Sequence, residues 1–340
     1  MLKEILNRLV EGKDLREDEA SEAMSFIMDG KALPTQIASF LTALRMKGET
    51  VQEITGFARA MRARTLQIRT TNGDPIVDTC GTGGDGNNTF NISTAVAFVA
   101  AGSGVTVAKH GNRSVSSQCG SADVLEALGV NIHLPPERVE QCLQEIGMAF
   151  LFAPLFHPAM MHALGPRREI GIRTVFNLLG PLTNPARATV HLAGIYREDL
   201  LRPVAEVLRN LGSKAAFVVH SEDRCDEISI SGKTTVCQLK GGDIVTYRIE
   251  PEMAGLKRAD LKEIQGGTPE KNGDILLQVL RGEPGPPRDV VLLNAAAVFV
   301  AAEKASDLRT GTEMAAESID SGRAKKKLEE LIQFTNCEGS

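Results

Sequence analysis

The chain contains a glycine-rich loop whose composition suits phosphate binding. Residues 81–86 read GTGGDG, and glycines let backbone amides converge on an anion without steric clash. A helix predicted to begin near Asn91 would add its N-terminal amides, while Thr89, Ser93 and Thr94 would add hydroxyl groups. A tight turn without a ligand is the alternative, since the loop lacks both the Gly-Lys-Ser/Thr ending of a P-loop and strict G-x-G-x-x-G spacing.

A second polar loop favours the phosphate interpretation. Residues 109–117 read KHGNRSVSS and crowd cationic, amide and hydroxyl donors around Gly111. Packing gives no reason for such crowding after a strand, although a solvated surface loop is the alternative. Ligands of open α/β sheets bind beyond the carboxyl ends of the strands, so the two loops would face each other if strands 76–79 and 105–108 are neighbours.

Two adjacent carboxylates, Asp226 and Glu227, precede an apolar segment and are candidates for holding a magnesium ion. Mg²⁺ takes one or two carboxylates and completes its shell with water and substrate phosphates. The nearby pair Glu222 and Asp223 is equally acidic, and composition alone leaves both pairs open. A solvated acidic turn is the alternative for either pair.

Arg167 is a candidate for binding a substrate carboxylate, because a guanidinium group matches a carboxylate with two parallel hydrogen bonds. The alternative is an exposed helical arginine paired with Glu169. The isolated histidines are interpreted as packing or surface residues; they are His133, His157, His162, His191 and His220.

The first seventy residues predict helices and no strand. Apolar spacing predicts one helix over residues 17–29. Thr35 is expected to cap a second helix, which ends at Gly48. Thr50 and Glu53 have the spacing of a capping box at the start of a third.

From residue 75 onward, strand-like and helix-like segments alternate. Strands are predicted at 75–78, 105–108, 148–152, 190–195 and 215–219, and helices at 91–101, 121–128, 135–146, 198–211 and 290–302. Residues 228–238 and 244–250 are expected to be antiparallel strands at the sheet edge. The pattern predicts an α/β fold with a mainly parallel central sheet flanked by helices, plus a small all-helical domain. We expect the helical domain to comprise residues 1–70, joined by 157–185, and the α/β domain to comprise 71–156 and 186–340.

Bulk properties exclude several functional classes. A net charge of −5 gives no reason to expect a nucleic-acid partner. The six cysteines show no C-x-x-C spacing, so a zinc or redox site is not expected. The apolar runs are too short to span a bilayer, and the N-terminal segment lacks the layout of a signal peptide. We therefore expect a cytoplasmic protein with neither nucleic-acid nor membrane partners.

An ordered set of motifs resembles the anthranilate phosphoribosyltransferase family. The motifs are 81–85 (GTGGD), 91–94 (NIST), 109–113 (KHGNR), 176–185 (FNLLGPLTNP) and 267–270 (GTPE), and the resemblance runs from about residue 2 to 335. It implies a fold related to the pyrimidine nucleoside phosphorylases and a homodimer formed through the helical domain. The implied reaction transfers the phosphoribosyl group of 5-phosphoribosyl 1-pyrophosphate to the amine of anthranilate, in tryptophan biosynthesis.

The same resemblance implies roles for individual residues, with no covalent nucleophile. Phosphoribosyl pyrophosphate would be bound by Gly81, Gly84, Asp85, Thr89, Asn91, Ile92, Ser93, Thr94, Lys109, His110, Gly111, Asn112, Arg113, Ser114, Val115, Ser116, Ser117 and Ser121. Anthranilate would be bound by Gly81, His110, Asn112, Pro154 and Arg167. Ser93, Asp226 and Glu227 would serve two Mg²⁺ ions per subunit. Arg224-Cys225 stands where the family usually has Gly-Leu or similar before the acidic pair.

Two other functions compete with this interpretation. A nucleoside phosphorylase would use inorganic phosphate as the nucleophile and would need a pyrimidine site. A catalytically silent paralogue that binds nucleic acid or a regulator would show a broad basic face and have no use for a metal-binding pair.

Overall fold

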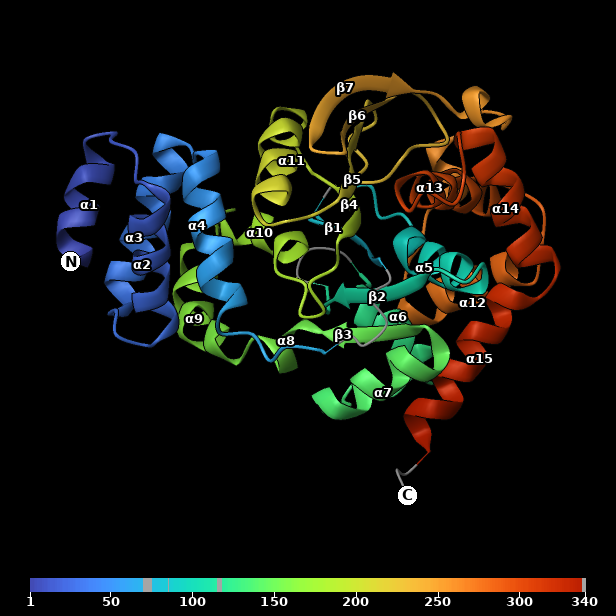
Figure 1. The fold of residues 1–340 in the computed structure, drawn as a ribbon, viewed down its shortest axis with the longest axis horizontal. Coiled ribbons are helices and arrows are strands. Elements are labelled where there is room, and N and C mark those ends of the chain that lie inside the picture. Colours follow the sequence, from blue (N-terminus) through green and yellow to red (C-terminus); the bar gives the residue numbers. More distant parts are fainter. Residues whose placement is uncertain (70–74, 85, 115–117, 338–340) are drawn as a thin grey trace.

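A seven-stranded sheet forms the centre of the molecule (Figure 1). The computed structural model describes residues 1–69, 75–84, 86–114 and 118–337. Four residues predicted for the phosphate loops, Asp85, Val115, Ser116 and Ser117, therefore lie outside the described residues. The strands are β1 (Ile76–Gly81), β2 (Thr106–Gly111), β3 (Met148–Phe152), β4 (Val190–Gly194), β5 (Ala215–Ser221), β6 (Thr234–Lys240) and β7 (Asp243–Ile249).

The sheet order confirms the predicted mainly parallel topology. The order is β3-β2-β1-β4-β5-β6-β7, in which β3 to β5 are parallel and β6 and β7 are antiparallel at one edge. The predicted edge strand over 228–238 begins six residues too early, since β6 starts at Thr234. Its first residues instead form a turn, because the hydroxyls of Ser229 and Ser231 bond to the Asp223 carboxylate and not to a neighbouring strand.

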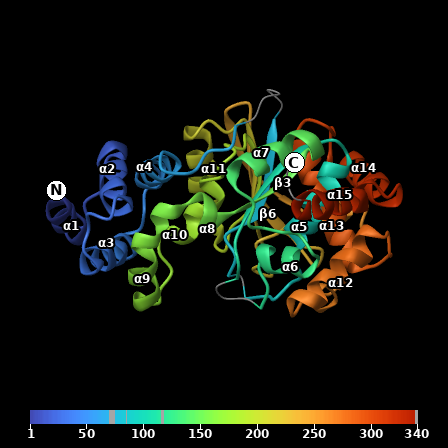
Figure 2. The ribbon, with the colours of Figure 1, turned by 90° about the horizontal axis from the view of Figure 1, so that it is seen from below.

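Helices cover both faces of the sheet (Figure 2). On strand β5 the side chains of Ala215, Phe217 and Val219 belong to one core, and those of Ala216 and Val218 to another. This alternation follows the two-residue period of a strand. The first core includes α5 (Ile92–Gly102), α12 (Pro269–Leu280), α13 (Pro286–Ala301), α14 (Leu308–Asp320) and α15 (Arg323–Asn336). On the opposite face, α11 (Leu201–Asn210) packs against β5 and β6.

The N-terminal part is a bundle of helices, which lies at the left of Figure 1. Its members are α1 (Leu2–Val10), α2 (Glu17–Met28), α3 (Pro34–Lys47) and α4 (Val51–Arg62), and α9 (Met161–Ile170) packs against α2 and α3. The expected cap at Thr35 is wrong, because Pro34 already occupies the first helical position, which suits proline. The capping box is confirmed: Thr50 Oγ1 accepts from the Glu53 amide at 3.2 Å, and Glu53 accepts from the Thr50 amide at 2.8 Å.

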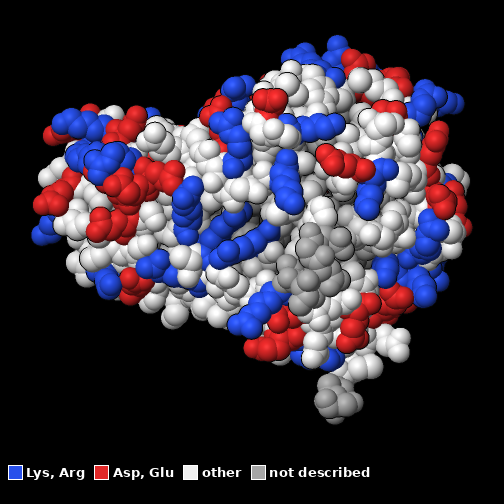
Figure 3. Space-filling view, in the orientation of Figure 1, with Lys and Arg blue, Asp and Glu red and all other residues white. Residues whose placement is uncertain are grey.

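The remaining elements are one helix that packs against β3, namely α7, and short connections between the layers. They are α6 (Ser121–Ala127), α7 (Pro136–Ile146), α8 (Ala153–Phe156), α10 (Phe176–Leu179), and the 3₁₀ helices η1 (Pro158–Met160), η2 (Gly180–Leu182), η3 (Glu198–Leu200), η4 (Pro251–Ala254) and η5 (Leu261–Ile264). Lys and Arg side chains gather on the middle of the molecular face in Figure 3, between the helical bundle and the α/β part. Within the described residues, no helix combines the length and the apolar content that crossing a bilayer requires.

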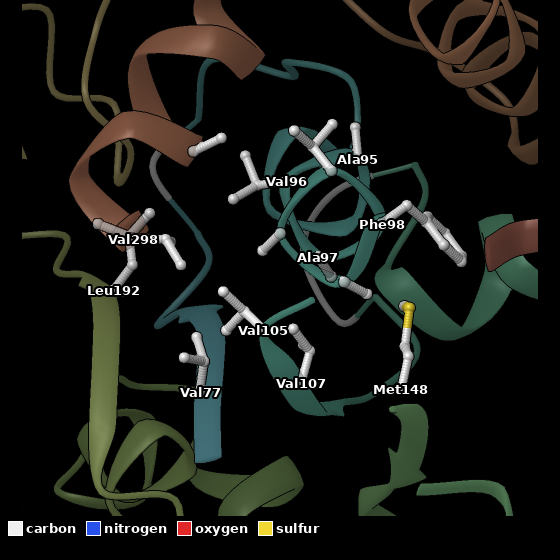
Figure 4. Packing of buried hydrophobic residues seen from close by; sticks show 14 of the residues in the cluster. Val77, Ala95, Val96, Ala97, Phe98, Val105, Val107, Met148, Leu192 and Val298 are labelled. Carbon is white, nitrogen blue, oxygen red and sulfur yellow. The ribbon is translucent and has the colours of Figure 1, made fainter. Parts of the chain in front are cut away.

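Helix α5 is the buried centre of the first core (Figure 4). Every residue of this helix except Ser93 is buried, which confirms the prediction made from a run that is apolar on all sides. Val96 and Ala97 of α5 lie over Val77 of β1 and Val107 of β2, with Val298 of α13 beside them. This packing fixes the position of the first turn of α5, where the candidate site begins.

Candidate active site

The two predicted phosphate loops leave the same edge of the sheet. Strands β1 and β2 are parallel neighbours, with Val77 opposite Val107, so their carboxyl ends point in the same direction. The condition on which the two loops were expected to face each other, that strands 76–79 and 105–108 are neighbours, is therefore met. Strand β4 flanks β1 on the other side, with Gly194 opposite Gly81. From β1 the chain adds β2 and β3 on one side of the sheet, and then β4 and β5 on the other side. Ligands of α/β sheets bind at such a switch point, which here lies between β1 and β4.

Glycines at the ends of β1 and β4 let the acidic pair come close to the sheet. A Cβ atom at Gly81 would lie 2.4 Å from Asp226 Oδ2, and one at Gly194 would lie 1.4 Å from the Asp226 carbonyl oxygen. Both distances are far below a normal contact, so any larger side chain would displace Asp226. Gly81 is therefore needed to make room for the Asp226 carboxylate, as well as for the turn of the loop.

Ser93, Asp226 and Glu227, which were predicted to serve metal ions, are brought together by the fold. Asp226 Oδ2 accepts a hydrogen bond from the Gly83 amide at 2.8 Å, and Glu227 Oε1 accepts one from the Ser93 amide at 3.2 Å. Both carboxylates thus contact the glycine-rich loop or the first turn of α5. Carboxylate and hydroxyl oxygens are hard ligands and match the preference of Mg²⁺.

The second acidic pair, Glu222 and Asp223, forms its contacts with other side chains of the protein. The Asp223 carboxylate accepts hydrogen bonds from the hydroxyls of Ser221, Ser229 and Ser231. Glu222 is exposed and lies 3.7 Å from Arg248. Over the described ranges, no three His, Cys, Asp or Glu side chains cluster so as to hold a metal. A cation beside Asp226 and Glu227 would therefore need further oxygen ligands, as Mg²⁺ bound to phosphates does.

Lys109 places a buried cation beneath the glycine-rich loop. Its side chain is 1% exposed, and Nζ donates to the Thr79 carbonyl oxygen and to Ser93 Oγ at 3.2 Å. Burial lowers the pKa of Lys109, and the neighbouring carboxylate of Asp78 opposes that shift. The ammonium group thus lies between the end of β1 and the first turn of α5, where an anionic ligand would offset its desolvation.

Asn91 is held by residues from two other segments. Its Nδ2 donates to the Cys119 carbonyl at 3.3 Å, and its Oδ1 accepts from Asn272 Nδ2 at 2.9 Å. Asn272 is buried and also accepts from the Gly267 amide at 2.7 Å. The 267–270 motif is therefore tied to the phosphate loop through Asn272. Sequence reasoning missed this residue, whose only signal was its place two positions after the motif.

Several predicted ligands face the protein interior or its own side chains. The Ile92 and Thr94 side chains are buried in α5, and Thr94 Oγ1 has no hydrogen-bond partner among the described residues. Arg113 bonds to Asp123 at 3.1 Å and to Glu126 at 2.9 Å. The remaining predicted residues lie around the same loops: Thr89 pairs with Gln265, the Ser114 amide donates to Asp123, and Ser121 Oγ donates to the Asn112 carbonyl.

His110 belongs to a chain of buried hydrogen bonds. Its Nδ1 lies 3.2 Å from the Gly180 carbonyl oxygen, and its Nε2 lies 3.2 Å from His157 Nε2. Because a carbonyl only accepts, Nδ1 of His110 carries the proton and Nε2 accepts from His157. Burial lowers the pKa of His110 to about 3 and that of His157 to about 4, so both rings are neutral near pH 7. The contact with His157, 47 residues away, had no signal in the sequence.

A short stretch of chain, from Phe176 to Gly180, links the surroundings of Arg167 to those of His110. Arg167 is half-buried on α9 and lies over the Phe176 ring, with 4.8 Å from Cζ to the ring centroid. Burial lowers its pKa. Phe176 begins α10, which leads directly to Gly180 beside His110. Among the described side chains Arg167 forms no ion pair, so the alternative pairing with Glu169 is not observed.

Pro154 and Asn112 are exposed residues that follow strands near His110. Pro154 lies in the first turn of α8, directly after β3, while Asn112 follows β2. The Asn112 Oδ1 atom accepts from the Arg113 amide at 2.7 Å. Because β2 and β3 are parallel neighbours, both residues lie at the carboxyl edge of the sheet.

Comparisons with known proteins agree with this architecture. The family model "Glycosyl transferase family, helical bundle domain" matches residues 3–65, and "Glycosyl transferase family, a/b domain" matches residues 73–325. The chain is 56% identical to the anthranilate phosphoribosyltransferase of Symbiobacterium thermophilum and 58% identical to that of Moorella thermoacetica, in each case over 98% of both chains.

Solved structures of similar proteins extend the comparison. The anthranilate phosphoribosyltransferase of Thermus thermophilus superposes with a TM-score of 0.91 at 45% identity, over 98% of this chain and 99% of the other. The Saccharomyces cerevisiae enzyme, in complex with PRPP and Mg, superposes with a TM-score of 0.90 at 30% identity, over 98% and 97% of the chains. On this evidence the chain belongs to the anthranilate phosphoribosyltransferase family.

Proposed function

We propose that this chain transfers the phosphoribosyl group of 5-phosphoribosyl 1-pyrophosphate to the amine of anthranilate, giving N-(5-phosphoribosyl)anthranilate and pyrophosphate in tryptophan biosynthesis. The observation that carries the proposal is the meeting of the glycine-rich loop, Lys109 and the acidic pair at the first turn of α5. The yeast relative whose structure contains PRPP and Mg supports the choice of substrate, and its complex with 4-fluoroanthranilate supports the acceptor.

The diphosphate of the substrate would lie against the glycine-rich loop and the loop after β2. The glycine-rich loop and the buried Lys109 would face its oxygens, beside the N-terminus of α5. Ser93, Asp226 and Glu227 would hold two Mg²⁺ ions per subunit, together with diphosphate oxygens. Bound Mg²⁺ neutralises the negative charge of the leaving pyrophosphate.

Anthranilate would enter between α9 and the end of β2. Arg167 would bind its carboxylate and the neutral ring of His110 would lie near the aromatic ring. An aromatic amine is already neutral at pH 7, so the reaction requires positioning and charge stabilisation more than a strong base. The amine would attack C1 of the ribose on the face opposite to the leaving pyrophosphate, through a transition state that resembles an oxocarbenium ion.

The chain organisation is part of this proposal. Residues 1–70 with 157–185 would form the helical domain, and 71–156 with 186–340 the α/β domain. The packing of α9 on α3 supports this division. The proposal includes a homodimer in the cytoplasm. Its formation through the helical domain is supported by large exposed apolar side chains there, namely Val10, Leu33, Met46, Met161 and Leu164. Sedimentation equilibrium tests it: the mass of a monomer at micromolar protein would reject the dimer.

A fluorescence assay tests the proposed reaction. Protein, Mg²⁺, phosphoribosyl pyrophosphate and anthranilate are mixed, and the loss of anthranilate fluorescence is followed. We expect turnover that requires both the metal and the sugar diphosphate. A parallel reaction with inorganic phosphate and thymidine tests the nucleoside phosphorylase alternative. Phosphorolysis of thymidine without loss of anthranilate would reject the proposal.

A further inference from the structure

The turn that carries the acidic pair is built around Asp223. Oδ1 of this carboxylate accepts from Ser221 Oγ and from the Cys225 amide at 3.1 Å, and Oδ2 accepts from the hydroxyls of Ser229 and Ser231. Ser221 and Ser229 are each 1% exposed. Four donors from both sides of the acidic pair thus converge on one carboxylate.

These hydrogen bonds fix an unfavourable backbone conformation just before the pair. Arg224 has φ +65°, in the left-handed region that disfavours residues other than glycine. The turn closes by hydrogen bonds from the Arg224 amide to the Ser221 carbonyl at 2.9 Å and from the Ser221 amide to the Cys225 carbonyl at 3.2 Å. Such a conformation persists only where its surroundings determine it, which Asp223 does here.

The turn is also attached to its neighbours at both ends. Asn87 of the glycine-rich loop donates to the Asp223 carbonyl at 3.0 Å. Downstream, the buried Asn294 of α13 accepts from the Ile228 amide and donates to the Ile228 carbonyl, each at 2.9 Å. Asp226 and Glu227 are therefore held between Asp223 on one side and Asn294 on the other. Their distance from the glycine-rich loop depends on both attachments.

We infer that Asp223 is a positioning residue, which sets Asp226 and Glu227 for metal binding without contacting the ion itself. The inference rests on the proposed metal role of that pair. Residues that orient metal ligands commonly change metal affinity about 10- to 100-fold when they are replaced. Asp223 has the same function here through hydroxyl donors from its own turn, and no role for it follows from the reaction alone.

Manganese binding tests the inference directly. Mn²⁺ is titrated into the protein with inorganic pyrophosphate present, and free Mn²⁺ is measured by EPR. We expect Asp223→Ala to raise the Kd for Mn²⁺ about tenfold. The matched control is Glu222→Gln, which removes the same charge one residue away, where the exposed carboxylate lies 3.7 Å from Arg248. The Kd of this control should stay within about twofold of the wild-type value. Hydrogen exchange of residues 224–228 should accelerate in Asp223→Ala only.

The outcomes separate the inference from the proposed function. A folded Asp223→Ala protein with wild-type Kd and wild-type exchange overturns the inference. If Asp226→Asn/Glu227→Gln also binds Mn²⁺ normally, the metal role of the pair fails as well; if this double variant alone loses binding, only the inference fails. Should Asp223→Ala not fold, Ser231→Ala at the rim of the turn replaces it. A Kd raised about threefold or more then supports the inference, and a Kd within about twofold of the wild-type value overturns it.

Discussion

Glu227 accepts a hydrogen bond from the backbone amide of Ser93 at 3.2 Å, although the two residues stand 134 positions apart in the chain. The contact places a carboxylate at the N-terminal turn of α5, where backbone amides attract negative charge. A diphosphate bound at the same turn would meet this carboxylate, so their coexistence requires cations between them. Lys109 is one such cation, and Mg²⁺ is the other in the proposed function.

Lys109→Met should lower both activity and stability. The substitution keeps the length of the side chain but leaves the buried Thr79 carbonyl oxygen and the buried Asp78 carboxylate without the ammonium group, so the free energy of unfolding should fall by about 1–3 kcal/mol. The kcat should fall about 10²- to 10³-fold, the usual effect of removing one donor that stabilises developing charge. Urea unfolding and steady-state kinetics measure the two effects. Lys214→Met, at an exposed lysine, is the control; a similar kcat for both variants would contradict the role of Lys109.

Arg167→Ala should raise the KM for anthranilate about tenfold or more, with little effect on the KM for phosphoribosyl pyrophosphate, because a carboxylate loses its charged partner. The neighbouring Arg168 is exposed, and Arg168→Ala should leave both constants near their wild-type values. Initial rates with each substrate varied in turn provide the measurement. Equal increases in the two KM values would reject the assignment of Arg167 to anthranilate.

Arg224→Gly should stabilise the protein. Arg224 has φ +65°, and the left-handed conformation costs a residue with a Cβ atom about 1 kcal/mol, part of which glycine loses again through chain entropy. We expect the free energy of unfolding to rise by about 0.5 kcal/mol in urea titrations. Arg224→Ala removes the same charge but keeps the strain, and should give no increase. Equal stabilisation by both would show that charge, not backbone strain, is responsible.

The stability of the protein should depend on His157 below pH 6.5. Burial holds the pKa of His157 at about 4, below its ordinary 6.5, so the unfolded chain binds more protons than the folded one between these values. Stability is complete above pH 6.5 and decreases as the pH falls toward 4. In His157→Gln the slope of the free energy of unfolding against pH should be smaller by about 1.4 kcal/mol per pH unit between these two values. Urea unfolding at several pH values measures the slope. His162→Gln, at an exposed histidine, should keep the wild-type slope, and an unchanged slope in His157→Gln would contradict the prediction.

The sequence was most informative where one local pattern determined the structure. The run after Asn91 is apolar on all sides and forms the buried helix α5, and the alternation of strands and helices predicted that β1 and β2 are parallel. Helices α1, α12, α14 and α15 were not predicted. In α1, only Leu2, Ile5 and Leu9 are buried, and the rest of its sequence is largely polar or charged. Such a short helix is stabilised mainly by packing in the bundle, which the sequence does not show.

Contacts between distant segments could not be predicted from single residues. His157 meets His110 only because the turn after β3 packs beside the end of β2, and Asn272 meets Asn91 only through the position of α12. Composition likewise left the two acidic pairs open, since both have equal charge, and only the family resemblance favoured Asp226 and Glu227. The structure distinguishes them by the serine hydroxyls that surround Asp223.

The most direct test of the proposed site is a crystal structure of this protein with phosphoribosyl pyrophosphate and Mn²⁺, whose anomalous scattering locates the metal. We predict an anomalous peak beside Asp226 and Glu227, with the diphosphate against the glycine-rich loop and near Lys109. A diphosphate bound elsewhere, with none at residues 81–94 or 109–117 and no metal beside the acidic pair, would contradict the account.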